Sequence, residues 1–95
     1  MRGVNKPEPD GIRQWVGRNV KAAREYAGLT QQELCLGANL SQPYLSQCES
    51  AKWNIGVDNL YRIAVATGFT VSNLVDPHFD PASASRTNAR ARRKD

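Results

Sequence analysis

The amino-acid sequence predicts an all-α domain, a compact bundle of five helices, on three observations. Apolar residues recur every three or four positions over residues 12–27 and again over residues 57–67, which is the spacing of one helix face. Helix-capping residues stand at Thr30, Ser41 and Thr70. Glycine, asparagine or proline follows the expected helices, and these residues favour helix ends. A chain of 95 residues has room for one such domain.

The first helix is expected over residues 12–27, after a cap at Asp10. Its apolar face consists of Ile12, Val16, Val20, Ala23 and Ala27. Gly28 follows and ends the helix. Trp15 and Tyr26 flank the apolar face, where they either edge the core or contact another subunit.

Two short helices joined by a tight turn form the centre of the chain. Thr30 and Glu33 make a capping box, so a helix begins directly after Thr30. Ser41 caps the next helix. Pro43 suits the first turn of that helix, because an N–H at this position would have no partner within the helix and proline has none. Asn39 tolerates the left-handed conformation that the turn between them needs. Packing between these helices is expected from Leu34, Cys35, Leu40 and Leu45, which leaves Gln42, Pro43, Tyr44, Ser46 and Gln47 facing outward.

The last two helices lie over residues 57–67 and 71–75. Gly68 closes the fourth helix and Thr70 caps the fifth, which Pro77 prevents from continuing far.

Composition divides the chain into three parts. Residues 1–9 have no apolar period and are expected to form a flexible N-terminal arm. Residues 10–76 make up the folded domain. Residues 77–95 contain too few apolar side chains to offset the entropy of ordering, so we expect a disordered basic tail. His78 lies alone in this tail, and we assign it no role.

Several functional classes find no support in the sequence. No apolar run reaches the roughly 20 residues of a membrane span, and the N-terminus lacks a signal-peptide core, so we expect a cytoplasmic protein. Cys35 and Cys48 have no partners at metal-ligand spacing and are expected to be small buried residues, with no metal and no cofactor. No nucleophile, base or phosphate-binding loop is recognisable, and we expect no enzyme.

Three segments resemble one family. They are Leu-Thr-Gln-Gln-Glu-Leu at 29–34, Leu-Ser-Gln-Pro-Tyr-Leu-Ser-Gln-Cys-Glu at 40–49 and Asn-Ile-Gly-Val-Asp-Asn-Leu at 54–60. Together they are similar to the phage-repressor and Cro class of helix-turn-helix DNA-binding proteins, over about residues 12–76. The Tyr-Leu-Ser run and the last segment are also similar, more weakly, to controller proteins of restriction-modification systems. The resemblance implies a transcription regulator that binds double-stranded DNA.

In that class the helix matching Gln42–Ser50 enters the major groove, and its side chains meet base edges. Gln42 and Gln47 suit base reading, since an amide both donates to and accepts from an adenine edge. Pro43 offers apolar surface to a thymine methyl group, and Ser46 has a hydroxyl for a base or a phosphate. Any surface helix has a polar face, so these residues indicate DNA recognition only in combination with the helix-turn-helix motif.

Contacts with the DNA backbone are expected from Gln31, Tyr44, Lys52, Trp53 and Asn54. Gln31 stands at a helix N-terminus, which favours phosphate through its N–H groups and its dipole. For Trp53, the alternative is an ordinary loop residue that covers the core.

Ala51 departs from the family pattern. The family usually has a glycine in a left-handed cap at this position, whereas alanine is disfavoured there by roughly 1 kcal/mol. The preceding helix is therefore expected either to run on or to end differently.

The resemblance further implies an ion pair between Arg24 and Glu49 that ties the first helix to the recognition helix. A homodimer is expected, because small domains often gain stability by association. Its expected contact residues are Val71, Leu74 and Val75.

An alternative function remains, an antitoxin that binds DNA and sequesters a toxin protein. Such proteins commonly present an apolar segment to the toxin, and the tail offers only Phe79 as an anchor.

Overall fold

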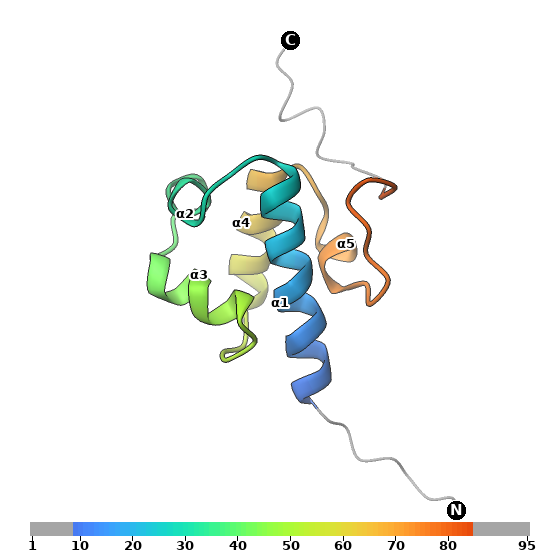
Figure 1. Ribbon diagram of the computed structural model, residues 1–95. Helices are drawn as coiled ribbons and strands as arrows, with labels where there is room; N and C mark the ends of the chain where they lie inside the picture. The colour runs from blue at the N-terminus through green and yellow to red at the C-terminus, as the bar shows by residue number, and fades with distance from the viewer. Residues whose placement is uncertain (1–8, 85–95) are drawn as a thin grey trace, which may run out of the picture.

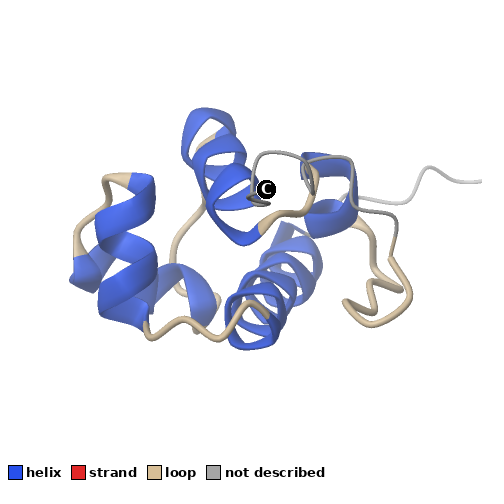
Figure 2. Cartoon of the chain, turned by 90° about the horizontal axis from the view of Figure 1, so that it is seen from above, coloured by secondary structure: helices blue, strands red, loops and turns tan. Residues whose placement is uncertain are grey.

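Five α-helices follow one another in the computed structural model, which describes residues 9–84, and no strand occurs in that range (Figures 1 and 2). They are α1 Pro9–Tyr26, α2 Gln31–Ala38, α3 Gln42–Glu49, α4 Val57–Thr67 and α5 Val71–Val75. The predicted all-α class and the order of the five helices are confirmed. α1 starts before the expected cap at Asp10, so that residue lies inside the helix.

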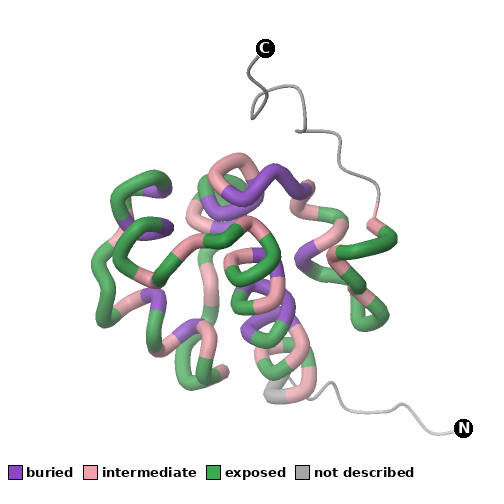
Figure 3. The backbone as a smooth tube through the Cα atoms, turned by 45° about the horizontal axis from the view of Figure 1, so that its top comes forward, coloured by how far each residue is buried: buried purple, intermediate pink, exposed green. Residues whose placement is uncertain are grey.

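Helix α1 occupies the middle of the bundle (Figure 1). α2 and α3 lie on one side of it and α5 on the other, while α4 packs against both α2 and α5. The fully buried apolar side chains come from every helix and from the α4–α5 loop: Val20, Ala23, Leu34, Leu45, Ile63, Phe69 and Leu74. Figure 3 marks the buried residues along the backbone, and they occur in every helix.

The expected starts of α2 and α3 are confirmed by their hydrogen bonds. The Glu33 N–H donates to Thr30 Oγ1 at 3.0 Å, and the Thr30 N–H donates to Glu33 Oε1 at 2.9 Å, which completes the capping box. Ser41 Oγ accepts from the Tyr44 N–H at 3.3 Å. Asn39 adopts a φ of 57°, the left-handed conformation expected of the turn between α2 and α3.

Helix α3 ends at Glu49, and Ala51 adopts the left-handed cap conformation at a φ of 67°, so the helix neither runs on nor ends differently from the family pattern, and both expected departures are wrong. The Ala51 N–H donates to the Cys48 carbonyl at 3.1 Å, and the Lys52 N–H donates to the Gln47 carbonyl at 2.9 Å. These two bonds form a Schellman motif. They satisfy carbonyls that the helix end leaves open, which offsets the strain of a non-glycine residue there.

Residues 77–84 do not match the expectation that the tail begins at Pro77. They form turns against the bundle, with Phe79 edge-on to Phe69 at a ring-centroid distance of 5.2 Å. Arg18 Nη2 donates to the Pro77 carbonyl at 3.2 Å. The aromatic contact and this bond order a segment that looked too polar to fold. The rest of the expected tail, residues 85–95, and most of the expected arm lie outside the described residues.

Asn19 anchors α5 to α1 from inside the bundle. Its side chain is buried, and Nδ2 donates to the Leu74 carbonyl at 3.0 Å and to the Asp76 carbonyl at 2.7 Å. Both amide protons thus satisfy carbonyls at the end of α5. Trp15 Nε1 donates to the neighbouring Val75 carbonyl at 2.9 Å, so Trp15 edges the core as one of the two expected alternatives.

Candidate nucleic-acid interface

Helix α3 turns one face to the core and the opposite face to solvent. Leu45 and Cys48 are buried. Gln42, Pro43 and Ser46 are exposed, and Gln47 is partly buried. The outward face therefore presents two amides, a hydroxyl and a proline ring without a formal charge. These groups can read base edges, whereas their lack of charge gives them little general attraction to phosphate.

Arg24 and Glu49 hold α3 against α1. Arg24 Nε donates to Glu49 Oε2 at 2.7 Å and Nη2 donates to Oε1 at 3.1 Å, a bidentate ion pair. The two side chains are only 11% and 4% exposed. The hydrogen bond to Glu49 raises the pKa of Arg24 above its ordinary value, against the opposing effect of burial. This is the pair that the family resemblance implied.

Gln31 joins the same network. Its Nε2 donates to Glu49 Oε1 at 3.1 Å, so the carboxylate receives bonds from α1 and from the start of α2. Arg24 Nη1 also donates to the Leu29 carbonyl at 2.9 Å, which fixes the loop between those helices. The side chain that we expected to clamp a phosphate thus orients α3. An amide nitrogen carries a second N–H, which leaves Gln31 one donor besides the bond to Glu49.

A glycine lets α3 approach α1 closely. A Cβ atom on Gly17 would lie 2.5 Å from the carbonyl oxygen of Cys48 and 3.1 Å from that of Glu49. The backbone at the end of α3 therefore rests directly on α1. Gly17 was not among the residues predicted to matter, although a glycine inside an amphipathic helix is costly enough to signal a packing requirement.

Tyr44 connects α3 to the start of α4. Its hydroxyl oxygen accepts from the Gly56 N–H at 3.3 Å and from Asn59 Nδ2 at 3.1 Å. The hydroxyl expected at a DNA phosphate is therefore bonded within the protein, and Asn59 enters the network without having been predicted. Because both bonds end at the beginning of α4, Tyr44 fixes the loop that follows α3.

That loop carries Lys52, Trp53 and Asn54, all exposed. Trp53 is 52% exposed and lies beside Tyr44, with ring centroids 6.1 Å apart. Trp53 therefore does not cover the core, which was the alternative interpretation. Cys48 Sγ lies 3.9 Å from the Asn54 carbonyl, and burial raises the pKa of the Cys48 thiol. The loop is thus anchored from beneath while its side chains stay accessible.

The three residues expected at a dimer contact differ in their exposure to solvent. Leu74 is completely buried, because the single turn of α5 directs it into the core, and it cannot contact a partner. Val71 is partly buried and Val75 is exposed. Over residues 9–84, no cluster of side chains is suited to a metal ion and no helix has the length and apolar character needed to cross a membrane.

Comparison with known sequences decides the family. The helix-turn-helix family profile matches residues 20–74, more than half of the chain. The chain belongs to this family. The helix-turn-helix protein shares 39% identity over 66 residues with the uncharacterized HTH-type transcriptional regulator y4dJ of Sinorhizobium fredii, a match that covers 70% of this chain and 86% of that one.

It is also 40% identical over 60 residues to the immunity repressor protein of Bacillus phage phi105. That match covers 63% of this chain, which spans only 42% of the length of the repressor. The resemblance to the phage-repressor and Cro-like class is confirmed, and the members of this class are DNA-binding transcriptional regulators.

Two solved structures share the architecture of the helix-turn-helix protein. The hypothetical transcription factor NHTF from Neisseria superposes with a TM-score of 0.68 at 27% identity, over 82% of this chain and 90% of that one. The clp gene regulator ClgR from Corynebacterium glutamicum superposes with a TM-score of 0.64 at 24% identity, over 74% and 71% of the two chains. The second likeness supports the fold alone.

Proposed function

We propose that this protein is a homodimeric transcription regulator that reads a palindromic operator with the outward face of α3. The observation that carries the proposal is the firm attachment of this uncharged face. Arg24, Gln31 and Glu49 fix α3 from one side, and Tyr44 fixes the following loop from the other. A helix held in this way can place short side chains against base edges.

Within α3, Gln42 and Gln47 are the proposed base readers, with Pro43 against a thymine methyl group and Ser46 at a base or phosphate. Bidentate bonding of a glutamine amide to adenine is worth about 1–3 kcal/mol of base discrimination. The exposed positions of Gln42 and Ser46 support these roles.

Around α3, the proposed phosphate contacts are the start of α2 with Gln31 and the loop with Lys52, Trp53 and Asn54. Lys52 is the one basic residue of this loop. For Tyr44 the proposed role is indirect, because its hydroxyl bonds hold the loop in place.

A homodimer supports the reading of a palindrome because two-fold symmetry in the protein matches that of the operator. Half-sites would then lie about one helical turn, roughly 34 Å, apart. Control of restriction-modification genes is the proposed subtype, for which a neighbouring methyltransferase or endonuclease gene would be the supporting observation.

The antitoxin function is less well supported. Phe79, the apolar anchor expected in the tail, packs against Phe69 and is partly buried. A toxin would have to displace it from the bundle. We therefore favour a regulator that acts as its own dimer.

Selection of bound sites from random double-stranded DNA with the purified protein tests the proposal. We expect a palindromic consensus. On it, Gln42→Ala and Gln47→Ala should each weaken binding by about 1–3 kcal/mol and relax preference at one base position, with little loss on random DNA. Ser72→Ala, at an exposed position of α5, is the matched control. Equal losses on both DNAs would show that α3 does not read bases.

A further inference from the structure

An exposed apolar surface lies on the side of α4 that faces away from the core. Val57 is 76% exposed and Tyr61 is 61% exposed. Together with Val71 of α5 and the charged residues Asp58 and Arg62 they line a shallow hollow, and we call these five residues the α4–α5 patch. The opposite side of α4 packs into the core through Leu60, Ile63 and Ala64. The α4 residues of the α4–α5 patch therefore do not contribute to the core of a single chain.

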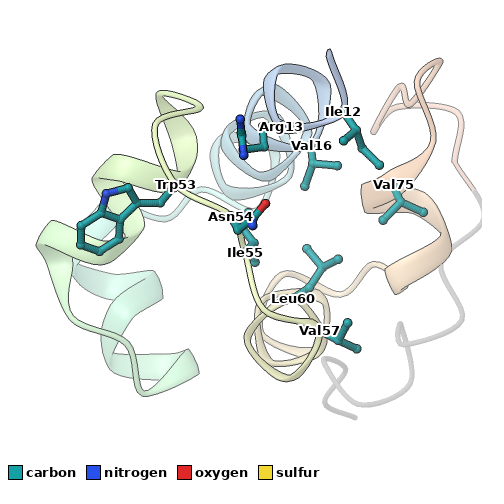
Figure 4. A pocket seen from close by; sticks show the side chains of 9 residues that line it. All are labelled: Ile12, Arg13, Val16, Trp53, Asn54, Ile55, Val57, Leu60 and Val75. Atoms are coloured by element: carbon teal, nitrogen blue, oxygen red, sulfur yellow. The ribbon is translucent and has the colours of Figure 1, made fainter. Parts of the chain in front are cut away.

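The patch continues into an apolar groove at the start of α4. Val57 of α4 lines both hollows, and the groove reaches Ile12 of α1 and Val75 of α5, which are also exposed. Figure 4 shows these side chains facing one another from three helices, while the Trp53 ring lies to the side of them. A continuous exposed apolar surface of this kind marks an interaction site.

The two charged side chains of the patch face no opposite charge within the described chain. Over residues 9–84, neither Asp58 nor Arg62 forms an ion pair within 4.0 Å. Arg62 Nη1 donates to Asn59 Oδ1 at 3.1 Å instead. Asp58 lies in the first turn of α4, where the helix dipole stabilises a negative charge. Its carboxylate oxygens remain available to a binding partner.

From this arrangement we infer that a second copy of the chain docks on the α4–α5 patch, with the two α4 helices antiparallel across a two-fold axis. The inference rests on the proposed homodimer and specifies its interface. Residues four apart lie one above the other on a helix. An antiparallel pair therefore sets Asp58 against the partner's Arg62, and Arg62 against the partner's Asp58.

The same symmetry sets Val57 against the partner's Tyr61. An interface across a two-fold axis must be self-complementary, and the patch fulfils this condition in both charge and apolar surface. Residues 85–95 of the same chain suit the patch less well. They contain no apolar side chain larger than alanine and carry five basic residues, which would face Arg62.

Charge reversal tests the pairing. We expect Asp58→Arg and Arg62→Asp each to weaken self-association at least tenfold in sedimentation equilibrium of the full chain, because each places like charges opposite one another. An equimolar mixture of the two variants should recover association, since every crossed pair then joins opposite charges. The double variant D58R/R62D should recover it as well.

Lys21→Asp is the matched control, because it makes the same change of charge as Arg62→Asp at an exposed position of α1. Its association should equal that of the unchanged protein. Thermal unfolding of each variant separates loss of the interface from loss of the fold, and recovery in the mixture itself requires folded chains.

Other outcomes overturn the inference. If the unchanged protein is a dimer and both single variants remain dimers, the interface lies elsewhere while the proposed homodimer stands. If single variants dissociate but their mixture does not associate, the antiparallel pairing is wrong. If the unchanged protein is monomeric with and without operator DNA, this inference and the proposed homodimer are both overturned. Residues 85–95 or another protein would then be the candidates to bind the patch.

Discussion

Arg24 ties α3 to α1 and to the loop before α2. Its guanidinium bonds both oxygens of Glu49 and the Leu29 carbonyl. We expect Arg24→Ala to lower the free energy of unfolding by about 3–5 kcal/mol, because the nearly buried Glu49 carboxylate would lose its counter-charge. Urea denaturation of the variant and the unchanged protein measures this difference.

Lys21→Ala is the control for this prediction, since it removes an exposed positive charge from the same helix. Its effect should stay within about 0.5 kcal/mol. Unchanged stability of Arg24→Ala combined with weaker operator binding would contradict the prediction and would place Arg24 at the DNA.

At the scale of single residues, the sequence predicted which side chains of α3 face outward but not which hydrogen bonds they form. The outward face of α3 followed from helical periodicity, because neighbours along a helix fix which side chains point the same way. The partners of Gln31 and Tyr44 did not follow. Their donors and acceptors were evident, but the bonds join residues 18 and 12–15 positions apart, and only the fold decides which acceptor is near.

The contact between α1 and α3 depends on the absence of a side chain at Gly17. Alanine would favour the helix by up to about 1 kcal/mol. Its Cβ atom would however lie 2.5 Å from the backbone oxygen of Cys48, and forcing an extra carbon into a packed site costs about 1–3 kcal/mol. We expect Gly17→Ala to destabilise the protein by about 1–2 kcal/mol, measured by urea denaturation.

Gly11→Ala provides the matched control on the same helix. A Cβ atom at Gly11 would have Trp15 as its nearest neighbour at 3.8 Å, an ordinary contact. This variant should be more stable than the unchanged protein by about 0.5–1 kcal/mol. Equal stabilisation by both substitutions would show that α3 does not rest on α1 as closely as described.

Helix boundaries divide into those that local chemistry determines and those that it does not. Thr30, Ser41 and Thr70 were predicted as caps because each bonds an N–H only three residues away. The end of α3 was not predicted, because alanine itself disfavours the left-handed conformation that Ala51 adopts. The order in residues 77–84 depends on Phe79 meeting the distant core, which composition cannot reveal.

The charge distribution over the complete chain separates the residues proposed to recognise bases from those expected to attract DNA phosphates. Residues 31–80, which contain α2, α3, α4 and α5, carry a net charge of −3. DNA binding draws much of its affinity from the neutralisation of phosphates. A recognition unit of negative charge therefore needs positive charge from other parts of the protein.

Residues 85–95 hold five basic residues and one acidic residue, and we expect them to supply affinity without specificity. Deleting this segment should weaken binding to operator and random DNA by similar factors, because arginine and lysine at the backbone do not distinguish bases. Ala84 is retained, since it packs against the core. The slope of log affinity against log salt should become shallower by about 0.9 for each phosphate that the shortened protein no longer neutralises. Replacing the five basic residues with glutamine at full length separates charge from chain length and should give the same change. An unaltered slope would contradict the prediction and assign the missing charge to residues 1–30, which carry a net +3.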